Sequence, residues 1–140
     1  MGARAGSWTV RETGGTWRPD WSETEPDPVP PVTIGWLTRH VIRWWSGVLA
    51  AIARSSRSCA NRFCGRVAQN ARSKRLNALS EQWREILSRL EESDLEQPLA
   101  YPWAEPRPLR IAVAWVASEL MKNIAEIGMV RHLFESQRHS

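Results

Sequence analysis

Apolar side chains recur at spacings of three and four residues along three separate stretches of the chain. This spacing is typical of helices that bury one face. The stretches cover residues 34–54, 76–90 and 109–135. No segment alternates apolar and polar residues with the period of two that a half-buried strand shows. The pattern therefore predicts an all-α protein.

Residues 76–90 carry the most regular pattern of the three. Their apolar side chains occupy the a and d positions of a coiled coil, namely Leu76, Leu79, Trp83, Ile86 and Leu90. Glu85 and Arg89 are four residues apart in the order that favours an ion pair on a helix surface. This seam could pack against the helix of residues 109–135 in a helical hairpin, or against a second copy in a homodimer through Leu76–Leu90.

Prolines and glycines divide the chain into segments. Residues 1–32 are rich in Gly, Pro, Ser, Thr and acidic residues without periodicity, which predicts a disordered acidic-aromatic tail. Thr33 is the expected N-cap of a basic amphipathic helix over residues 33–54, and an Arg/Ser-rich connector follows over 55–75. The helical hairpin or small bundle occupies residues 76–140.

Four prolines interrupt this hairpin in a loop over residues 97–108, because proline removes a backbone donor and clashes with the preceding helical turn. The loop also contains Tyr101 and Trp103. These apolar side chains are expected to pack over the core.

Charge is strongly segregated along the chain, although the formal net charge is only +4. Residues 1–32 contain three basic and five acidic side chains, residues 33–75 nine basic and none acidic, and residues 76–140 seven basic and ten acidic. The three segments thus have net charges of −2, +9 and −3. The central block is expected to attract phosphate groups of lipids or nucleic acids.

The helix in this block has an apolar face and neighbouring tryptophans. It is not a transmembrane span, since Arg43 and Arg54 enclose far fewer than the roughly 20 apolar residues that a span needs. It fits better in the plane of an anionic membrane surface or against a protein partner of unknown identity. The residues predicted to make this contact are Trp36, Leu37, Val41, Trp44, Trp45 and Val48. The alternative is that this face packs against the two later helices.

Basic side chains throughout the block are candidate anion-binding residues, and RNA or DNA is the alternative ligand. They are Arg39, Arg43, Arg54, Arg57, Arg62, Arg66, Arg72, Lys74 and Arg75. In the N-terminal tail, Trp17 and Trp21 lie among acidic residues and form a candidate linear motif for a protein partner. The alternative is a solvated tail.

Recognisable catalytic motifs are lacking. The three histidines lie far apart in sequence, and Cys59 and Cys64 have a C-x4-C spacing that does not predict a zinc site. The expectation is therefore a protein that is not an enzyme and uses no metal or cofactor. No secretory signal is evident, which favours an intracellular location, either cytoplasmic or peripheral to a membrane, with the nucleus as the alternative.

These features together predict a non-catalytic accessory or regulatory adaptor. It would bind other proteins through its helical faces and tryptophan motifs, and an anionic membrane surface is one location open to it. The alternative function is a nucleic-acid-binding accessory protein that uses the arginine-rich block over residues 39–75. Nine tryptophans, segregated charge and small size are also typical of viral accessory proteins.

Overall fold

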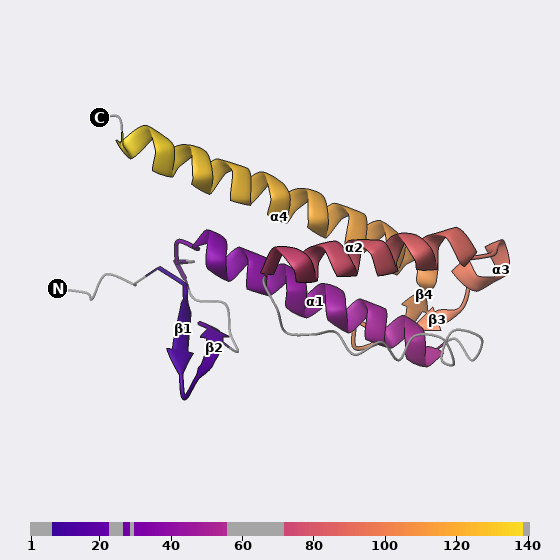
Figure 1. Ribbon diagram of the computed structural model, residues 1–140. Coiled ribbons are helices and arrows are strands. Elements are labelled where there is room, and N and C mark those ends of the chain that lie inside the picture. Colours follow the sequence, from indigo (N-terminus) through magenta and orange to yellow (C-terminus); the bar gives the residue numbers. More distant parts are fainter. Residues whose placement is uncertain (1–6, 23–26, 29, 56–71, 139–140) are drawn as a thin grey trace. The chain divides into compact units, whose positions relative to one another are not determined.

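The computed structural model describes residues 7–22, 27–28, 30–55 and 72–138, and this part of the chain is mostly helical (Figure 1). Its helices are α1 (Ile34–Ser55), α2 (Arg72–Arg89), α3 (Glu92–Leu95) and α4 (Leu109–Arg138). The described strands form only two small antiparallel pairs. The prediction of a small all-α protein is therefore confirmed.

The three long helices coincide closely with the three periodic stretches. The backbone N–H of Trp36 donates to Thr33 Oγ1 at 3.2 Å, so Thr33 caps α1 as predicted. α2 begins at Arg72 rather than at Leu76, and the predicted Glu85–Arg89 ion pair is present on its exposed surface. Periodicity was a sufficient guide here because each helix is long and buries one apolar face.

A β-hairpin lies in the segment where the sequence predicted a disordered tail. β1 (Val10–Thr13) pairs with β2 (Thr16–Pro19) in antiparallel register. The connecting Gly14 and Gly15 have φ angles of 59° and 75°. Glycine adopts this left-handed conformation without strain, and a two-residue turn of this kind matches the twist of paired strands. The hairpin thus replaces the predicted disorder over residues 10–19.

This hairpin is hydrogen-bonded to the segment that precedes α1. The backbone N–H of Trp8 donates to the carbonyl of Pro31 at 2.7 Å, and the N–H of Thr33 donates to the carbonyl of Trp8 at 3.0 Å. These two bonds flank a parallel bridge between Trp8 and Val32. The start of the hairpin is therefore fixed beside the start of α1.

The proline-rich connection before α4 is closed at its base by the second strand pair. β3 (Pro98–Leu99) runs antiparallel to β4 (Arg107–Pro108). The N–H of Leu109 donates to the carbonyl of Gln97 at 2.9 Å, and Leu99 is buried. Residues 100–106 consequently form a short, closed loop that presents Tyr101 and Trp103.

The chain divides into two compact units. Unit 1 comprises residues 1–41 and 122–140, and unit 2 comprises residues 42–121. Among the described residues of unit 1, the buried side chains include Trp36, Leu37, Val41 and Asn123. The larger core lies in unit 2 and consists of Ile42, Trp44, Trp45, Val48, Leu49, Ala51, Ile52, Leu79, Trp83, Ile86, Leu99, Leu109, Ala112 and Val116.

Candidate functional site

Four tryptophans of unit 2 form a connected aromatic cluster. Trp44 and Trp45 come from α1, Trp103 from the proline-rich loop and Trp115 from α4. The ring centroids of Trp44 and Trp115 are 5.2 Å apart in an edge-to-face arrangement, and those of Trp103 and Trp115 are 6.0 Å apart. Such edge-to-face pairs are favoured over face-to-face stacks by the quadrupoles of the rings. The loop is therefore joined to both helices through aromatic contacts.

Tyr101 lies directly against the backbone of α1 at Gly47. A Cβ atom added to Gly47 would be 2.6 Å from both Cζ and Oη of Tyr101, which is too close for any other residue without movement. Burial raises the pKa of the Tyr101 phenol, and the positive charge of Arg43 opposes part of this rise. Gly47 thus permits a tyrosine hydroxyl to lie against the helix beside the tryptophan cluster.

Three successive residues of α1 carry buried polar atoms without a hydrogen-bond partner in the described part of the chain. These atoms are Trp44 Nε1, Trp45 Nε1 and Ser46 Oγ. An indole N–H can only donate, and leaving a donor buried and unpaired costs about 1–3 kcal/mol. Three such atoms in sequence are an unusual concentration of unmet polar groups for a small core.

Ser46 differs from Ser55, Ser88 and Ser118, which also lie in described helices. Ser118 Oγ donates to the carbonyl of Ala114 at 3.0 Å, and Ser55 and Ser88 make equivalent bonds to carbonyls three residues earlier. This local bond is the usual way in which a helical serine satisfies its hydroxyl. The Ser46 hydroxyl makes no such bond. It remains available to a group from outside the helix.

Positive charge lies beside the aromatic cluster. The guanidinium of Arg107 is 5.1 Å from the ring centroid of Trp103, within the range of a cation–π contact. Arg43, on α1 next to Trp44, is exposed. We refer to Trp44, Trp45, Ser46, Tyr101, Trp103 and Trp115 as the α1–loop cluster. Its chemistry combines aromatic surface, unpaired donors and adjacent arginines.

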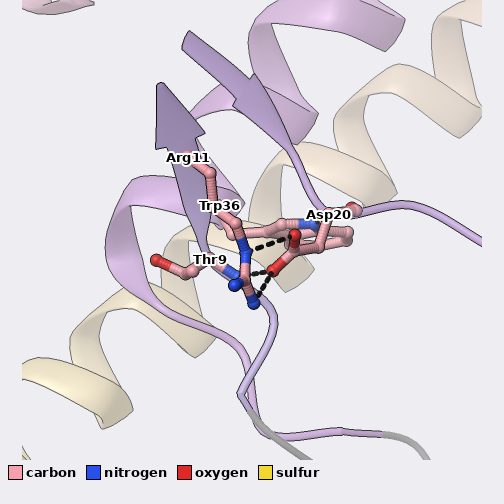
Figure 2. A network of polar contacts seen from close by, with 4 residues as sticks. All are labelled: Thr9, Arg11, Asp20 and Trp36. Atoms are coloured by element: carbon pink, nitrogen blue, oxygen red, sulfur yellow. Dashed lines mark hydrogen bonds and ion pairs between the residues drawn. The ribbon is translucent and has the colours of Figure 1, made fainter. Parts of the chain in front are cut away.

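A second polar network lies in unit 1 and is fully paired. Figure 2 shows the carboxylate of Asp20 facing Arg11 and the backbone of Thr9. It accepts from Arg11 Nε at 2.9 Å, Arg11 Nη2 at 3.3 Å and the N–H of Thr9 at 2.9 Å. The Arg11 guanidinium, followed by the Thr9 N–H, holds the pKa of Asp20 below its usual value. This network fastens the end of β2 to β1.

Trp36 connects the same network to α1. Its indole N–H donates to the backbone carbonyl of Asp20 at 2.7 Å, and its ring lies against the rings of Trp8 and His40 at centroid distances of 5.1 and 4.9 Å. Every named polar group has a partner, so the arrangement explains how the hairpin is held rather than how a ligand binds.

The residues predicted to contact a membrane or partner are all buried. Their exposed fractions range from 0% for Val48 to 7% for Trp36 and Trp44, and the other three are Leu37, Val41 and Trp45. Side chains that pack inside the protein are not available as an exposed face. The interpretation of this stripe as a binding surface is replaced by the alternative that it forms core.

The predicted anion-binding residues are only partly described. Arg43, Arg54 and Lys74 are exposed, whereas Arg39 and Arg75 are half-buried. Arg72 begins α2, and its side chain lies outside the description, as do Arg57, Arg62 and Arg66. None of the described helices is apolar over a long enough stretch to cross a bilayer.

The remaining predicted interaction residues lie in β2, directly after it, and in α2. Trp17 belongs to β2, with its side chain outside the description, and Trp21 follows β2 and is exposed. In the seam predicted for a homodimer, Leu79, Trp83 and Ile86 are buried within unit 2. These three side chains of the seam are therefore covered inside the chain, and the homodimer through Leu76–Leu90 stays a prediction.

The comparisons with known proteins identify one family. A family model described as the DinB superfamily matches residues 7–127. No curated protein and no solved structure matches the chain. The match begins before the hairpin and extends into α4, so it includes the α1–loop cluster.

This match corrects the function predicted from the sequence. The family is a metal-binding, enzyme-like helical fold, so the prediction of a non-catalytic adaptor is wrong, and the match gives no support to the nucleic-acid-binding alternative. Membership also gives no support to the accessory, membrane-associated or viral interpretations. The basic block led to these interpretations because charge alone does not distinguish a ligand site from a solvated surface.

The family implies a metal site, but the described side chains contain no group of three or more His, Cys, Asp or Glu residues that could hold a metal ion. His40, half-buried, stacks on Trp36, and His132 is exposed on α4. The donor set in the described part of the chain therefore does not fit a metal.

Proposed function

Because the chain belongs to the DinB superfamily, we propose that it binds a small planar anion at the α1–loop cluster of unit 2. The family match supports a function other than that of a non-catalytic adaptor. The proposal concerns binding. The sequence-based prediction that the chain is not an enzyme stays a prediction, because the family description names no reaction.

The observation that supports the proposal most strongly is the run of unpaired polar atoms at Trp44, Trp45 and Ser46. Each buried donor without a partner lowers the stability of the protein on its own. A ligand that accepts these hydrogen bonds would remove that cost on binding. The run is also localised at the aromatic cluster, where a ligand would find apolar surface as well.

The composition of the cluster indicates the class of ligand. Two indole N–H groups and a hydroxyl call for acceptor atoms, and Arg43 and Arg107 favour negative charge. The tryptophan and tyrosine rings favour a flat apolar body. An aromatic carboxylate combines these properties, with the carboxylate directed at the donors.

We would test this by titrating the protein with benzoate and following the indole N–H resonances by NMR. Benzylamine has the same ring with the opposite charge and serves as the ligand control. Benzoate is expected to bind saturably and to move the indole N–H signals of Trp44 or Trp45 downfield, as hydrogen bonding does. Benzylamine is expected to leave them in place.

Two serine variants identify the site. Ser46→Ala should weaken benzoate binding about tenfold, which corresponds to the loss of one hydrogen bond to a charged group. Ser118→Ala removes an exposed helical hydroxyl from the same unit and should leave the affinity unchanged. Absence of benzoate binding, or equal binding by wild type and Ser46→Ala, would show that the cluster is not this site.

A further inference from the structure

Gly47 is an unfavourable residue for the interior of α1, and the hydroxyl end of Tyr101 fills the space that it leaves. Glycine lowers helix stability by about 1 kcal/mol relative to alanine. A Cβ atom at this position would meet Cζ and Oη of Tyr101 at 2.6 Å and its Cε1 at 3.2 Å. Departures of this kind from local helix preference are expected where a residue serves a functional site.

The face of α1 that meets Tyr101 also carries a positive charge and an unpaired donor. Arg43 and Trp44 precede Gly47 by four and three residues, so all three lie on one side of the helix. Trp44 Nε1 is buried without a hydrogen-bond partner in the described part of the chain, and the charge of Arg43 acts on the Tyr101 phenol. The Tyr101 hydroxyl therefore lies on the face that presents these two side chains.

The proline-rich loop fixes Tyr101 from both sides. Leu99, two residues before it, is buried, and Trp103, two residues after it, contacts Trp115 edge-to-face at a centroid distance of 6.0 Å. The β3–β4 pair closes the loop at its base. A donor that is already held in place loses little conformational freedom on binding, so more of its hydrogen-bond energy contributes to affinity.

The phenol of Tyr101 keeps its proton at neutral pH. Its pKa is raised above the ordinary value of 10.0 because burial disfavours the charged form, and the charge of Arg43 opposes only part of this rise. A neutral phenol can donate a hydrogen bond, whereas a phenolate can only accept one. Tyr101 thus presents a donor, and not a negative charge, to an approaching anion.

We propose that the Tyr101 hydroxyl donates a hydrogen bond to the carboxylate of the aromatic ligand and makes the site select for that group. This role rests on the proposed function and adds a specificity residue from the loop to the donors of α1. The two oxygens of a carboxylate can accept about four hydrogen bonds, so donors from both elements can meet one ligand. A hydrogen bond to a charged acceptor is stronger than one to a neutral acceptor, which favours the carboxylate.

Fluorine NMR tests the contact without a substitution, because Tyr101 is the only tyrosine in the chain. Growth on 3-fluorotyrosine places a single fluorine beside its hydroxyl. Benzoate is expected to shift this fluorine signal saturably, with the same Kd as the indole N–H signals of the α1–loop cluster. Benzylamine is expected to leave the signal in place.

Tyr101→Phe keeps the ring and removes the hydroxyl. It should weaken benzoate binding about tenfold, which corresponds to the loss of one hydrogen bond to a charged group. Toluene has a methyl group in place of the carboxylate, so Tyr101→Phe and wild type should bind it equally. Ser118→Ala, which removes an exposed hydroxyl from the same unit, should leave the affinity for both ligands unchanged.

The possible results separate the role of Tyr101 from the proposed function. A wild type that does not bind benzoate overturns both. If wild type binds benzoate, an unmoved fluorine signal or a Tyr101→Phe variant of wild-type affinity overturns the role of Tyr101 alone. Equal weakening of benzoate and toluene binding by Tyr101→Phe also overturns it, because the hydroxyl would then support the fold and not the carboxylate.

Discussion

At the scale of single residues, the Ser46 hydroxyl shows most directly whether the polar atoms of the α1–loop cluster lack hydrogen-bond partners. Ser46→Ala should leave the free energy of unfolding unchanged or raise it by about 1 kcal/mol, because an unpaired hydroxyl is removed and alanine favours the helix. Urea denaturation measures the difference. Ser118→Ala is the control, since there an existing hydrogen bond is lost. A clear destabilisation by Ser46→Ala would mean that its hydroxyl is already paired.

Gly47 is a second residue whose role depends on one contact. Gly47→Ala should destabilise the protein by about 1–3 kcal/mol through overpacking against Tyr101, although alanine is the better helix former. Thermal or urea unfolding of the single variant gives this value.

A double-mutant cycle separates the contact from the effect on helix propensity. In a Tyr101→Ala background the clash is absent, so Gly47→Ala should become neutral or stabilising by up to about 1 kcal/mol. An equal penalty in both backgrounds would show that Tyr101 does not restrict this position.

At the scale of elements, the helices could be predicted from the sequence and the hairpin could not. Three long apolar stripes determine the helices because burial of one face requires the 3.6-residue period. β1 and β2 are only four residues each, too short for an alternating pattern to stand out. The Gly14-Gly15 pair was the available signal, since two glycines between short polar-apolar segments indicate a hairpin turn.

The candidate site was predictable only in part, because its residues come from segments that are distant in sequence. Trp44 and Trp45 were selected from the sequence, but their surroundings are set by the loop residues Tyr101 and Trp103 and by Trp115. The expectation that the loop packs over the core is confirmed by these contacts. Contacts between residues so distant in sequence leave no periodic trace, so the tryptophans were interpreted as an exposed face.

The hairpin has an acid-sensitive hydrogen-bond network. The pKa of Asp20 is lowered in the folded protein from a model-compound value of 3.8, so its carboxylate stabilises the hairpin above about pH 4, and this contribution is lost as the pH falls through the lowered pKa. The protection of the Thr9 amide, meaning its exchange rate relative to the intrinsic rate at the same pH, is therefore expected to fall below pH 4. Asp20→Asn should remove most of this pH dependence, whereas Glu12→Gln, on the same hairpin, should retain it. Identical profiles for wild type and Asp20→Asn would exclude the network as the cause.

At the scale of the whole molecule, the family match gives the segregated charge a different interpretation from the one that composition suggested. The match over residues 7–127 extends through the N-terminal hairpin, the basic block and most of α4. Composition had divided the same region into a tail, a basic helix and a connector. The apolar stripe of the basic helix is core, and Arg43 and Arg54 of the same helix are exposed.

The family is metal-binding, whereas the described side chains of this chain include no suitable set of metal ligands. The described residues contain no group of His, Cys, Asp or Glu suited to a metal, so neither EDTA nor added Zn²⁺ or Ni²⁺ should change Tm. A native-state site would be visible in this measurement, because a metal at a thousand times its Kd raises the free energy of unfolding by about 4 kcal/mol. A rise in Tm with Zn²⁺ that EDTA reverses would contradict the prediction. Such a result would require a ligand set different from any cluster of described residues.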